Sequence, residues 1–345
     1  MAGKSTALLI LALALLPTAC AVQDHSQAAA PQPSAQVIAL AGMISGSPGA
    51  LTFNGSPLQT GSALVTVQGR PSGPARLRPG SVFQGTAVKT PQGYELLSAE
   101  VHHEVEGIIE LVDLAGSRLV VMGQNVRVGA QADIGEEGPA TTSRSLQLAE
   151  LKAGDRVEVD GFPGADGFIQ ATRIEHVPAP AEAGGTFHGV LGVIDHRAKT
   201  ALAGGRLLSF ARAQVTGSLV HGARVEVQGS IIGGTVVATR MKVETGLEEL
   251  SGATLELCGP IRGLDPVAKT FLILSYRVDY GRAKVEGTLA NGTSVMAQAP
   301  FLPEGAAPEP ASKVRAGPRI EALLLNARAD AHGQARRAGG ANPST

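Results

Sequence analysis

Tryptophan is absent from this sequence of 345 residues, and aromatic side chains make up only 3% of it. Cores must therefore be built from aliphatic side chains, since hydrophobic residues still amount to 43% of the chain. Neither sign of charge is in excess, because 29 Lys and Arg stand against 30 Asp and Glu. A nucleic-acid-binding surface needs an excess of basic residues. We therefore expect no nucleic-acid partner.

Cysteine is nearly absent as well, with Cys20 and Cys258 the only two. If Cys20 carries a lipid, no intrachain disulfide can form, and a lone thiol such as Cys258 is most often buried and inert. Turn-forming residues are abundant in contrast, with 44 Gly and 21 Pro. This composition favours many short strands over long helices.

The first 20 residues, MAGKSTALLILALALLPTAC, have the layout of a secretory signal peptide. One lysine precedes an apolar run over residues 7–16, which is shorter than the roughly 20 residues that a membrane span requires. Two cleavage sites are possible. Cys20 can be the lipidated first residue of the mature chain, although Pro17 departs from the usual lipobox, or an ordinary signal peptidase can cut after Ala21.

A polar stretch rich in Pro and Ala follows at residues 21–35 and is typical of a flexible tether between a lipid anchor and a folded body. This favours lipidation of Cys20. We therefore expect an exported protein anchored in the cell envelope on the periplasmic side. Ala21 after the anchor, with no Asp there, resembles the start of lipoproteins that are sorted to the outer membrane, which implies the outer rather than the inner membrane if the chain is Gram-negative.

Internal repeats dominate the rest of the chain. The stretch after Gly189, VLGVIDHRAKTALAGGRLLSF, aligns without a gap with PIRGLDPVAKTFLILSYRVDY after Gly259, and an earlier copy starts at Gly107. A more divergent copy starts near Gly42. The sequence thus predicts four tandem units, followed by a disordered tail at 330–345. They are unit 1 (36–101), unit 2 (102–180), unit 3 (181–245) and unit 4 (246–329, with a Pro- and Ala-rich insertion at 299–317).

Each unit has the period-two pattern of half-buried strands, as in RVEVDGF and ARVEVQG, with glycine-centred turns between them. Short strands without helical periodicity predict an all-β fold made of small closed barrels or tight β-sandwich units. Closure into barrels would remove the exposed edges that let strands aggregate. In unit 4 the last strand is expected from RIEALLL at residues 319–325.

Three phrases recur in these units: GxIxxxD, LxxGDxVEVxG and AxRIE. They resemble the bacterial domain-of-unknown-function family 5666, which is often found in secreted proteins and lipoproteins. The resemblance covers nearly all of the chain beyond the tether and is strongest in units 2 and 3. It implies small barrels similar to the oligonucleotide/oligosaccharide-binding (OB) type, and it implies no activity and no catalytic residues.

Several acidic and histidine residues are candidates for a chemical site. Asp160 and Asp166 are interpreted as turn residues, because unit 3 has Gln228 and a Gly-Gly turn in their places. Aspartates that recur after the first strand are also assigned to turns; these are Asp113, Asp195 and Asp265. The residue before the first glycine of a unit varies between Glu106, His188 and Cys258, which is interpreted as a solvent-facing position. We expect no metal, cofactor or catalytic residue.

Tyr276 and Tyr280 lie on one strand and are the best candidates for an exposed aromatic pair that binds a ligand, although core or rim packing also explains them. The favoured hypothesis is a non-enzymatic envelope lipoprotein whose β-units form a scaffold that contacts envelope proteins or polysaccharide. An alternative is a binder of oligosaccharides or other small ligands that uses a cleft between units. A hydrolase or metal enzyme with a site assembled across units is the third.

Overall fold

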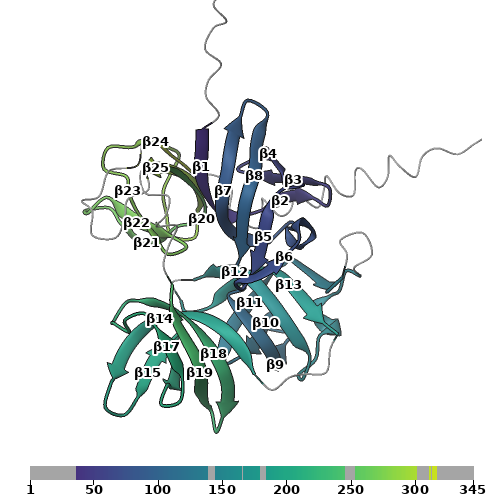
Figure 1. Cartoon of the computed structure of the whole chain (residues 1–345), viewed down its shortest axis with the longest axis vertical. Coiled ribbons are helices and arrows are strands. Elements are labelled where there is room, and N and C mark those ends of the chain that lie inside the picture. The colour runs from purple at the N-terminus through teal and green to yellow at the C-terminus, as the bar shows by residue number, and fades with distance from the viewer. Residues whose placement is uncertain are drawn as a thin grey trace, which may run out of the picture. The chain divides into compact units, whose positions relative to one another are not determined.

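The computed structural model describes residues 36–138, 144–164, 166–178, 184–244, 253–300, 311 and 313–316. The predicted signal peptide, the tether, Cys20 and the stretch 319–325 lie outside these residues. The described chain is all-β, and its strands fall within the four predicted units (Figure 1). No helix in this part of the protein is long and apolar enough to cross a membrane.

Unit 1 contains β1 (Gln36–Met43), β2 (Ser45–Ser47), β3 (Ala50–Phe53), β4 (Ser56–Gln59), β5 (Leu64–Val67), β6 (Arg70–Ser72), the short 3-10 helix η1 (Pro74–Arg76), β7 (Val82–Thr90) and β8 (Gly93–Val101). Unit 2 contains β9 (Val105–Asp113), β10 (Arg118–Val121), β11 (Gln124–Glu136), the 3-10 helix η2 (Leu148–Glu150), β12 (Arg156–Pro163) and β13 (Ile169–Val177).

Unit 3 contains β14 (Gly185–Asp195), β15 (Thr200–Ala203), β16 (Arg206–Ser209), β17 (Gln214–Thr216), β18 (Arg224–Ile232) and β19 (Thr235–Val243). Unit 4 contains β20 (Thr254–Pro260), β21 (Arg262–Asp265), β22 (Thr270–Ile273), β23 (Tyr276–Asp279), β24 (Lys284–Glu286), β25 (Ser294–Pro300) and β26 (Lys313–Ala316). The strand β26 lies inside the segment predicted as an insertion.

The strands of unit 3 close into a barrel in the order β14-β15-β16-β19-β18 and back to β14. All neighbours are antiparallel except β16 and β19, which are parallel. Unit 2 repeats this order as β9-β10-β11-β13-β12. This is the connectivity of an OB-type barrel, so the expectation of small OB-like barrels is confirmed.

Unit 1 follows the same path when β1 and β2 are taken as one interrupted first strand. The described strands of unit 4 form two sheets instead, one of β21, β22 and β23 and one that includes β20, β25 and β26.

Crowding explains why each unit keeps its first glycine. A Cβ atom added at Gly42 would lie 2.3 Å from the carbonyl oxygen of Cys258, and one at Gly189 would lie 2.7 Å from the amide nitrogen of Gly204. Added at Gly107 or Gly259, it would clash with the side chain of Met122 or Phe162 at 2.6 and 2.8 Å. The recurrence of glycine is therefore a packing requirement.

The first strands also join the units in pairs. β1 of unit 1 runs parallel to β20 of unit 4, and β9 of unit 2 pairs with β14 of unit 3. Units 2 and 3 share one continuous aliphatic core that includes Val105 and Phe187, which face each other across this pairing. The outer side of the first strand is thus covered by a neighbouring unit.

We expect Gly185→Ala to lower the free energy of unfolding by about 1–3 kcal/mol, because its Cβ would lie 2.1 Å from the carbonyl oxygen of Glu106, where β9 meets β14. Urea unfolding measures the change. Gly61→Ala is the control, since a Cβ there meets nothing within 4 Å, and it should stay within about 0.5 kcal/mol of the parent. Equal stability of the two variants would show that the β9–β14 contact is not tightly packed.

Candidate functional site

The tripeptide His102-His103-Glu104 connects β8 of unit 1 to β9 of unit 2. Its backbone bonds to three units: the amide of His102 donates to Val82, and the amide of Glu104 donates to Val159 at 2.8 Å. The carbonyl of Glu104 in turn accepts the amide of His188 at 2.9 Å. We call this tripeptide the junction, because its side chains enter two separate buried polar clusters.

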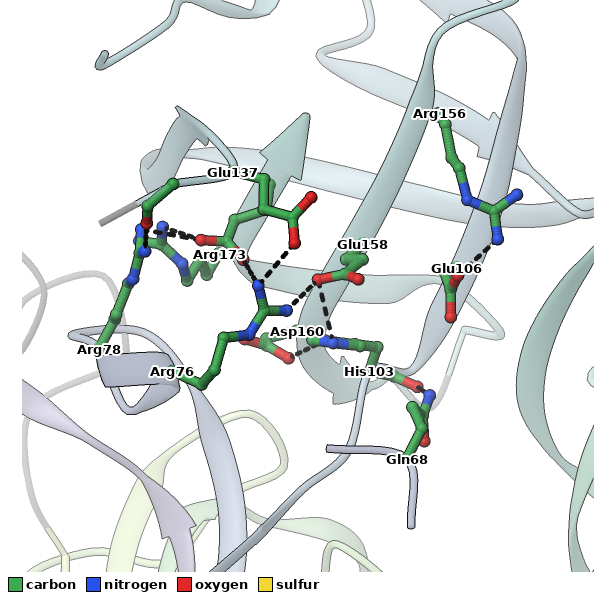
Figure 2. Close-up of polar contacts among 12 residues, drawn as sticks. Gln68, Arg76, Arg78, His103, Glu106, Glu137, Arg156, Glu158, Asp160 and Arg173 are labelled. Atoms are coloured by element: carbon green, nitrogen blue, oxygen red, sulfur yellow. Dashed lines mark hydrogen bonds and ion pairs between the residues drawn. The ribbon is translucent and has the colours of Figure 1, made fainter. Parts of the chain in front are cut away.

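The first cluster surrounds His103, whose ring lies between two acidic residues of β12 (Figure 2). Its Nδ1 is 2.8 Å from Asp160 Oδ1 and its Nε2 is 3.2 Å from Glu158 Oε2. Glu158 also accepts a hydrogen bond from Arg76 Nη2 at 2.5 Å. Arg76 ends η1 of unit 1, so this cluster bonds unit 1 to unit 2.

The carboxylates decide the charge of His103. Burial alone would lower the pKa of this imidazole, but Asp160 and Glu158 outweigh that effect and raise the pKa to about 10. Burial would likewise raise the pKa of Glu158, yet the bonds from His103 and Arg76 lower it to about 2. His103 is therefore an imidazolium at neutral pH and Glu158 a carboxylate.

More arginines extend the first cluster along the same boundary. Arg78 of unit 1 is 2.9 Å from Glu175 of β13, and Arg173 donates to the same carboxylate at 2.8 Å. Arg76 bonds Glu137 at 3.1 Å (Figure 2). Arg173 also bonds Asp133. Nearly every charge at this boundary is therefore matched by one of opposite sign.

The second cluster contains Glu104, Arg224, Glu244 and His188 and joins the junction to unit 3. The guanidinium of Arg224 donates to Glu104 at 2.7 Å and to Glu244 at 2.9 Å. His188 Nδ1 lies 2.5 Å from Glu244 Oε1. Burial would raise the pKa of Glu244, but the contacts with His188 and Arg224 lower it to about 2, so this carboxylate stays ionised.

His102 differs from its neighbour in protonation. Its Nε2 lies 3.1 Å from Gln84 Nε2, and its ring meets that of His188 edge-on with centroids 5.9 Å apart. Burial, together with the nearby His188, lowers the pKa of His102 to about 3. The junction thus places a neutral imidazole directly before a charged one.

A cavity of about 1120 Å³ opens beside both clusters and is lined mainly by polar side chains from units 1, 2 and 3, with a smaller share from unit 4. Its walls include the junction, Arg156 paired with Glu106, and a face of β18 and β19 that carries Glu226, Gln228, Arg240 and Lys242. Among the described residues, no group of three or more His, Cys, Asp or Glu side chains is arranged to hold a metal ion. The cavity therefore offers charges and hydrogen bonds for binding.

The family comparison identifies the repeats. A family model described as a domain of unknown function, DUF5666, matches residues 106–175 and 193–242. The chain contains two DUF5666 repeats. They correspond to the barrel of unit 2 and most of unit 3, the two units in which the resemblance is strongest. No curated protein matches the chain.

The turn assignment of the recurring aspartates is confirmed in both DUF5666 repeats and in unit 4. Asp113 Oδ1 accepts the amide of Gly116 at 2.9 Å, and Asp195 and Asp265 each accept two amides of the same turn. Asp166 also behaves as predicted, because it accepts the amide of Phe168. These aspartates shape turns of the units.

The turn interpretation of Asp160 is wrong. This residue lies within β12, is 3% exposed and bonds the imidazole of His103. The interpretation of the position before the first glycine as solvent-facing is also wrong, since His188 and Cys258 are buried and Glu106 pairs with Arg156. A neighbouring unit covers this face of the first strand, and comparison of isolated copies could not show that.

The two tyrosines and the second cysteine occupy different surroundings. Tyr276 lines the cavity and donates a hydrogen bond to Gln84 at 2.9 Å, whereas Tyr280 stacks on Phe271 with centroids 5.5 Å apart. Cys258 is buried, as expected of a lone thiol, and burial raises its pKa to about 12.

The sequence analysis did not identify the junction. The signal that could have found it is a His-His-Glu run at the boundary between two units.

We expect His103→Gln to lower the free energy of unfolding by about 3–5 kcal/mol at pH 6, because Asp160 then lacks its cation. The pKa of His103 rises from about 6.5 in an unfolded chain to about 10 in the fold. The stabilisation is therefore complete below about pH 6.5 and is lost as the pH rises through 10. Urea unfolding should show the variant and parent converging between pH 6 and pH 10.

His221→Gln is the matched control, because this ring is exposed and its contact with the Gly192 carbonyl at 3.1 Å involves no charged partner. Its effect should stay within about 0.5 kcal/mol at every pH. A penalty for His103→Gln that does not change with pH would contradict a charged His103.

Proposed function

We propose that this chain is a non-catalytic binding protein of the cell envelope, in which the β-units form a scaffold around a cavity that takes up a small polar ligand. The observation that carries the proposal is the cavity of about 1120 Å³ at the meeting point of the units. Its volume is of the order of small-molecule sites, which span roughly 300–1,000 Å³.

The chemistry of the walls supports a polar ligand. Most small-molecule pockets are apolar with a few polar groups, whereas this one carries Glu226, Arg240 and Lys242 beside the histidines of the junction. A buried wall of this kind is stable only when water or a ligand meets its hydrogen-bonding groups. An apolar ligand would remove that hydration without replacing it.

A scaffold without a ligand is the second candidate. It is favoured by the ion pairs at the unit boundary, such as Arg76 with Glu158 and Arg78 with Glu175, which fix the units against each other whether or not the cavity is filled. In that case the outer surfaces of the units would contact envelope proteins or polysaccharide. Ligand-induced stabilisation separates the two candidates.

The first testable consequence is thermal stabilisation by a polar ligand. In a panel of neutral, acidic and amino sugars, amino acids and dipeptides, at least one member should raise the melting temperature by a few degrees. A ligand at about 100 times its Kd adds about 2.7 kcal/mol to the stability of the native state.

Ser72→Trp should reduce this shift, because Ser72 is an exposed residue of the cavity wall and the indole would take up part of the space. Ser62→Trp is the control, an exposed serine that does not line the cavity. If no panel member raises the melting temperature, or if Ser72→Trp shows the same shift as Ser62→Trp, the cavity is not a ligand site and the scaffold candidate is favoured.

The second consequence concerns the anchor that we propose at Cys20. Cys20→Ala should move the protein from the membrane fraction to the soluble periplasmic fraction, because the alanine cannot carry a lipid. Fractionation followed by immunoblotting measures the distribution. A parent protein already found in the soluble fraction would show that cleavage after Ala21 is the correct alternative.

A further inference from the structure

In each unit, a short stretch of strand between the third and fourth strands of the fold pairs in parallel with the last strand of the unit. We call these stretches the edge segments: they are β5 in unit 1, residues 133–136 of β11 in unit 2, β17 in unit 3 and β24 in unit 4. The last strand takes only one edge of each segment. The second edge can therefore accept another strand, because its amides and carbonyls need partners.

In units 1 and 2 the chain itself covers this second edge. β6 returns antiparallel to β5 in unit 1. In unit 2 residues 144–146 return antiparallel to β11. There the amide of Glu136 donates to the carbonyl of Arg144 at 2.9 Å, and the amide of Leu146 donates to the carbonyl of Ile134 at 2.8 Å. Both units thus close the edge with an antiparallel return strand of their own.

Units 3 and 4 have connections that hold no return strand. Residues 217–223 lead directly from β17 to β18, and residues 287–293 lead from β24 to β25. The corresponding connections of units 1 and 2 run over 68–81 and 137–155. Within the described part of the chain, β17 pairs only with β19 and β24 only with β26.

The apolar residue at the centre of each edge segment differs in exposure accordingly. These residues occupy one register position, opposite Ala99, Ile174, Met241 and Val314 of the last strands. Where a return strand is present, the residue is 3% exposed (Val65) or 5% exposed (Ile134). Where it is absent, the residue is 40% exposed (Val215) or 39% exposed (Val285). A strand added to the open edge would therefore remove apolar surface from water, which is favourable.

Charge distinguishes the open edge of unit 3 from the closed edge of unit 2. In unit 2, Arg173 of β13 forms an ion pair with Asp133, its register partner on the edge segment. The corresponding pair in unit 3 is Arg240 and Gln214. Glutamine cannot neutralise the guanidinium, and Arg240 forms no ion pair with any other described residue. An acidic group is thus missing at this edge.

The other charges near β17 do not compensate for Arg240. Lys242 of β19 lies opposite Glu226 of β18, so these two charges offset each other. Arg212 is exposed two residues before β17 and has no ion pair within the described range. The β17 edge of a second copy would bring the same positive charges, and like charges across a strand pair are destabilising. Acidic side chains on an added strand fit better.

We propose that the open edge of β17 binds an extended segment of a partner protein, which runs antiparallel to β17 and carries apolar and acidic residues in alternation. Strand addition to an exposed sheet edge is a common mode of peptide recognition. Successive side chains of a strand point to opposite faces. The apolar residues of the segment would therefore cover Val215, and its acidic residues would lie on the face of Gln214 and Arg240. No residue of β17 lines the cavity, so this site does not depend on a cavity ligand.

Synthetic peptides test the site. The probe is the acetylated, amidated heptapeptide Glu-Val-Glu-Val-Glu-Val-Glu. Its controls carry Lys in place of Glu, or Pro in place of the central Val. Hydrogen–deuterium exchange with mass spectrometry is followed on the full chain at pH 7 as the peptide is titrated. The acidic peptide should slow exchange of residues 211–219, because added backbone hydrogen bonds protect amides. The lysine peptide and the proline peptide should not, since proline disrupts strand pairing.

Variants then locate the peptide. Arg240→Glu should weaken binding of the acidic peptide about tenfold and make the lysine peptide the better ligand, because the charge at the edge is inverted. A misfolded variant could not show that reversal. Val215→Asp should weaken both peptides, because it places a charge beneath their apolar residues. Val267→Asp is the matched control, since Val267 is 91% exposed in the turn between β21 and β22, and it should leave binding within about twofold of the parent.

Several results would overturn the proposal. Equal binding of the proline peptide, an unchanged preference in Arg240→Glu, protection outside residues 211–219, or no binding of the acidic peptide would each do so. Strong protection of β17 on its open edge before any peptide is added would also contradict it. Analytical ultracentrifugation would then show whether a second copy or another segment of the same chain occupies the edge, since only a second copy makes the mass depend on concentration.

Discussion

An imidazolium buried between two carboxylates fixes the centre of this structure. His103 bonds Asp160 and Glu158 of β12, and Glu158 reaches back to Arg76 of unit 1. Removing one member would leave a buried charge without compensation, which is far more costly than losing an exposed ion pair. The register of unit 1 on unit 2 is therefore set by where these charges meet.

Buried ion pairs are poor sources of net stability, because desolvation cancels much of the Coulomb attraction. The stability of each unit comes instead from its aliphatic interior, as in the continuous core of units 2 and 3. The charged junction contributes contacts of another kind, because His103 pairs with Asp160 and Glu104 pairs with Arg224 of unit 3 in the observed arrangement. Aliphatic cores thus stabilise the small barrels of a chain without tryptophan, and buried ion pairs connect these barrels to one another.

The interior of each unit could be predicted from the sequence, and the surfaces between units could not. Strand periodicity depends on each unit alone, so the strands, the turns at Asp195 and Asp265 and the barrel fold followed from pattern. Asp160 was misassigned because its burial depends on His103, which belongs to a different segment. The alternation of apolar and polar residues marks one face as polar, but it cannot show whether water or another unit meets that face.

A repeat position at which the copies carry different residues can therefore mark a contact between units as well as an exposed site. Glu106, His188 and Cys258 occupy one repeat position, and their variety first suggested contact with solvent. In the structure Glu106 pairs with Arg156, His188 lines the cavity, and Cys258 packs with the core of unit 1. Each copy has lost its resemblance where it meets a different neighbour. In a repeat protein whose units pack on one another, the variable position on an otherwise regular strand is thus the place to look for the interface.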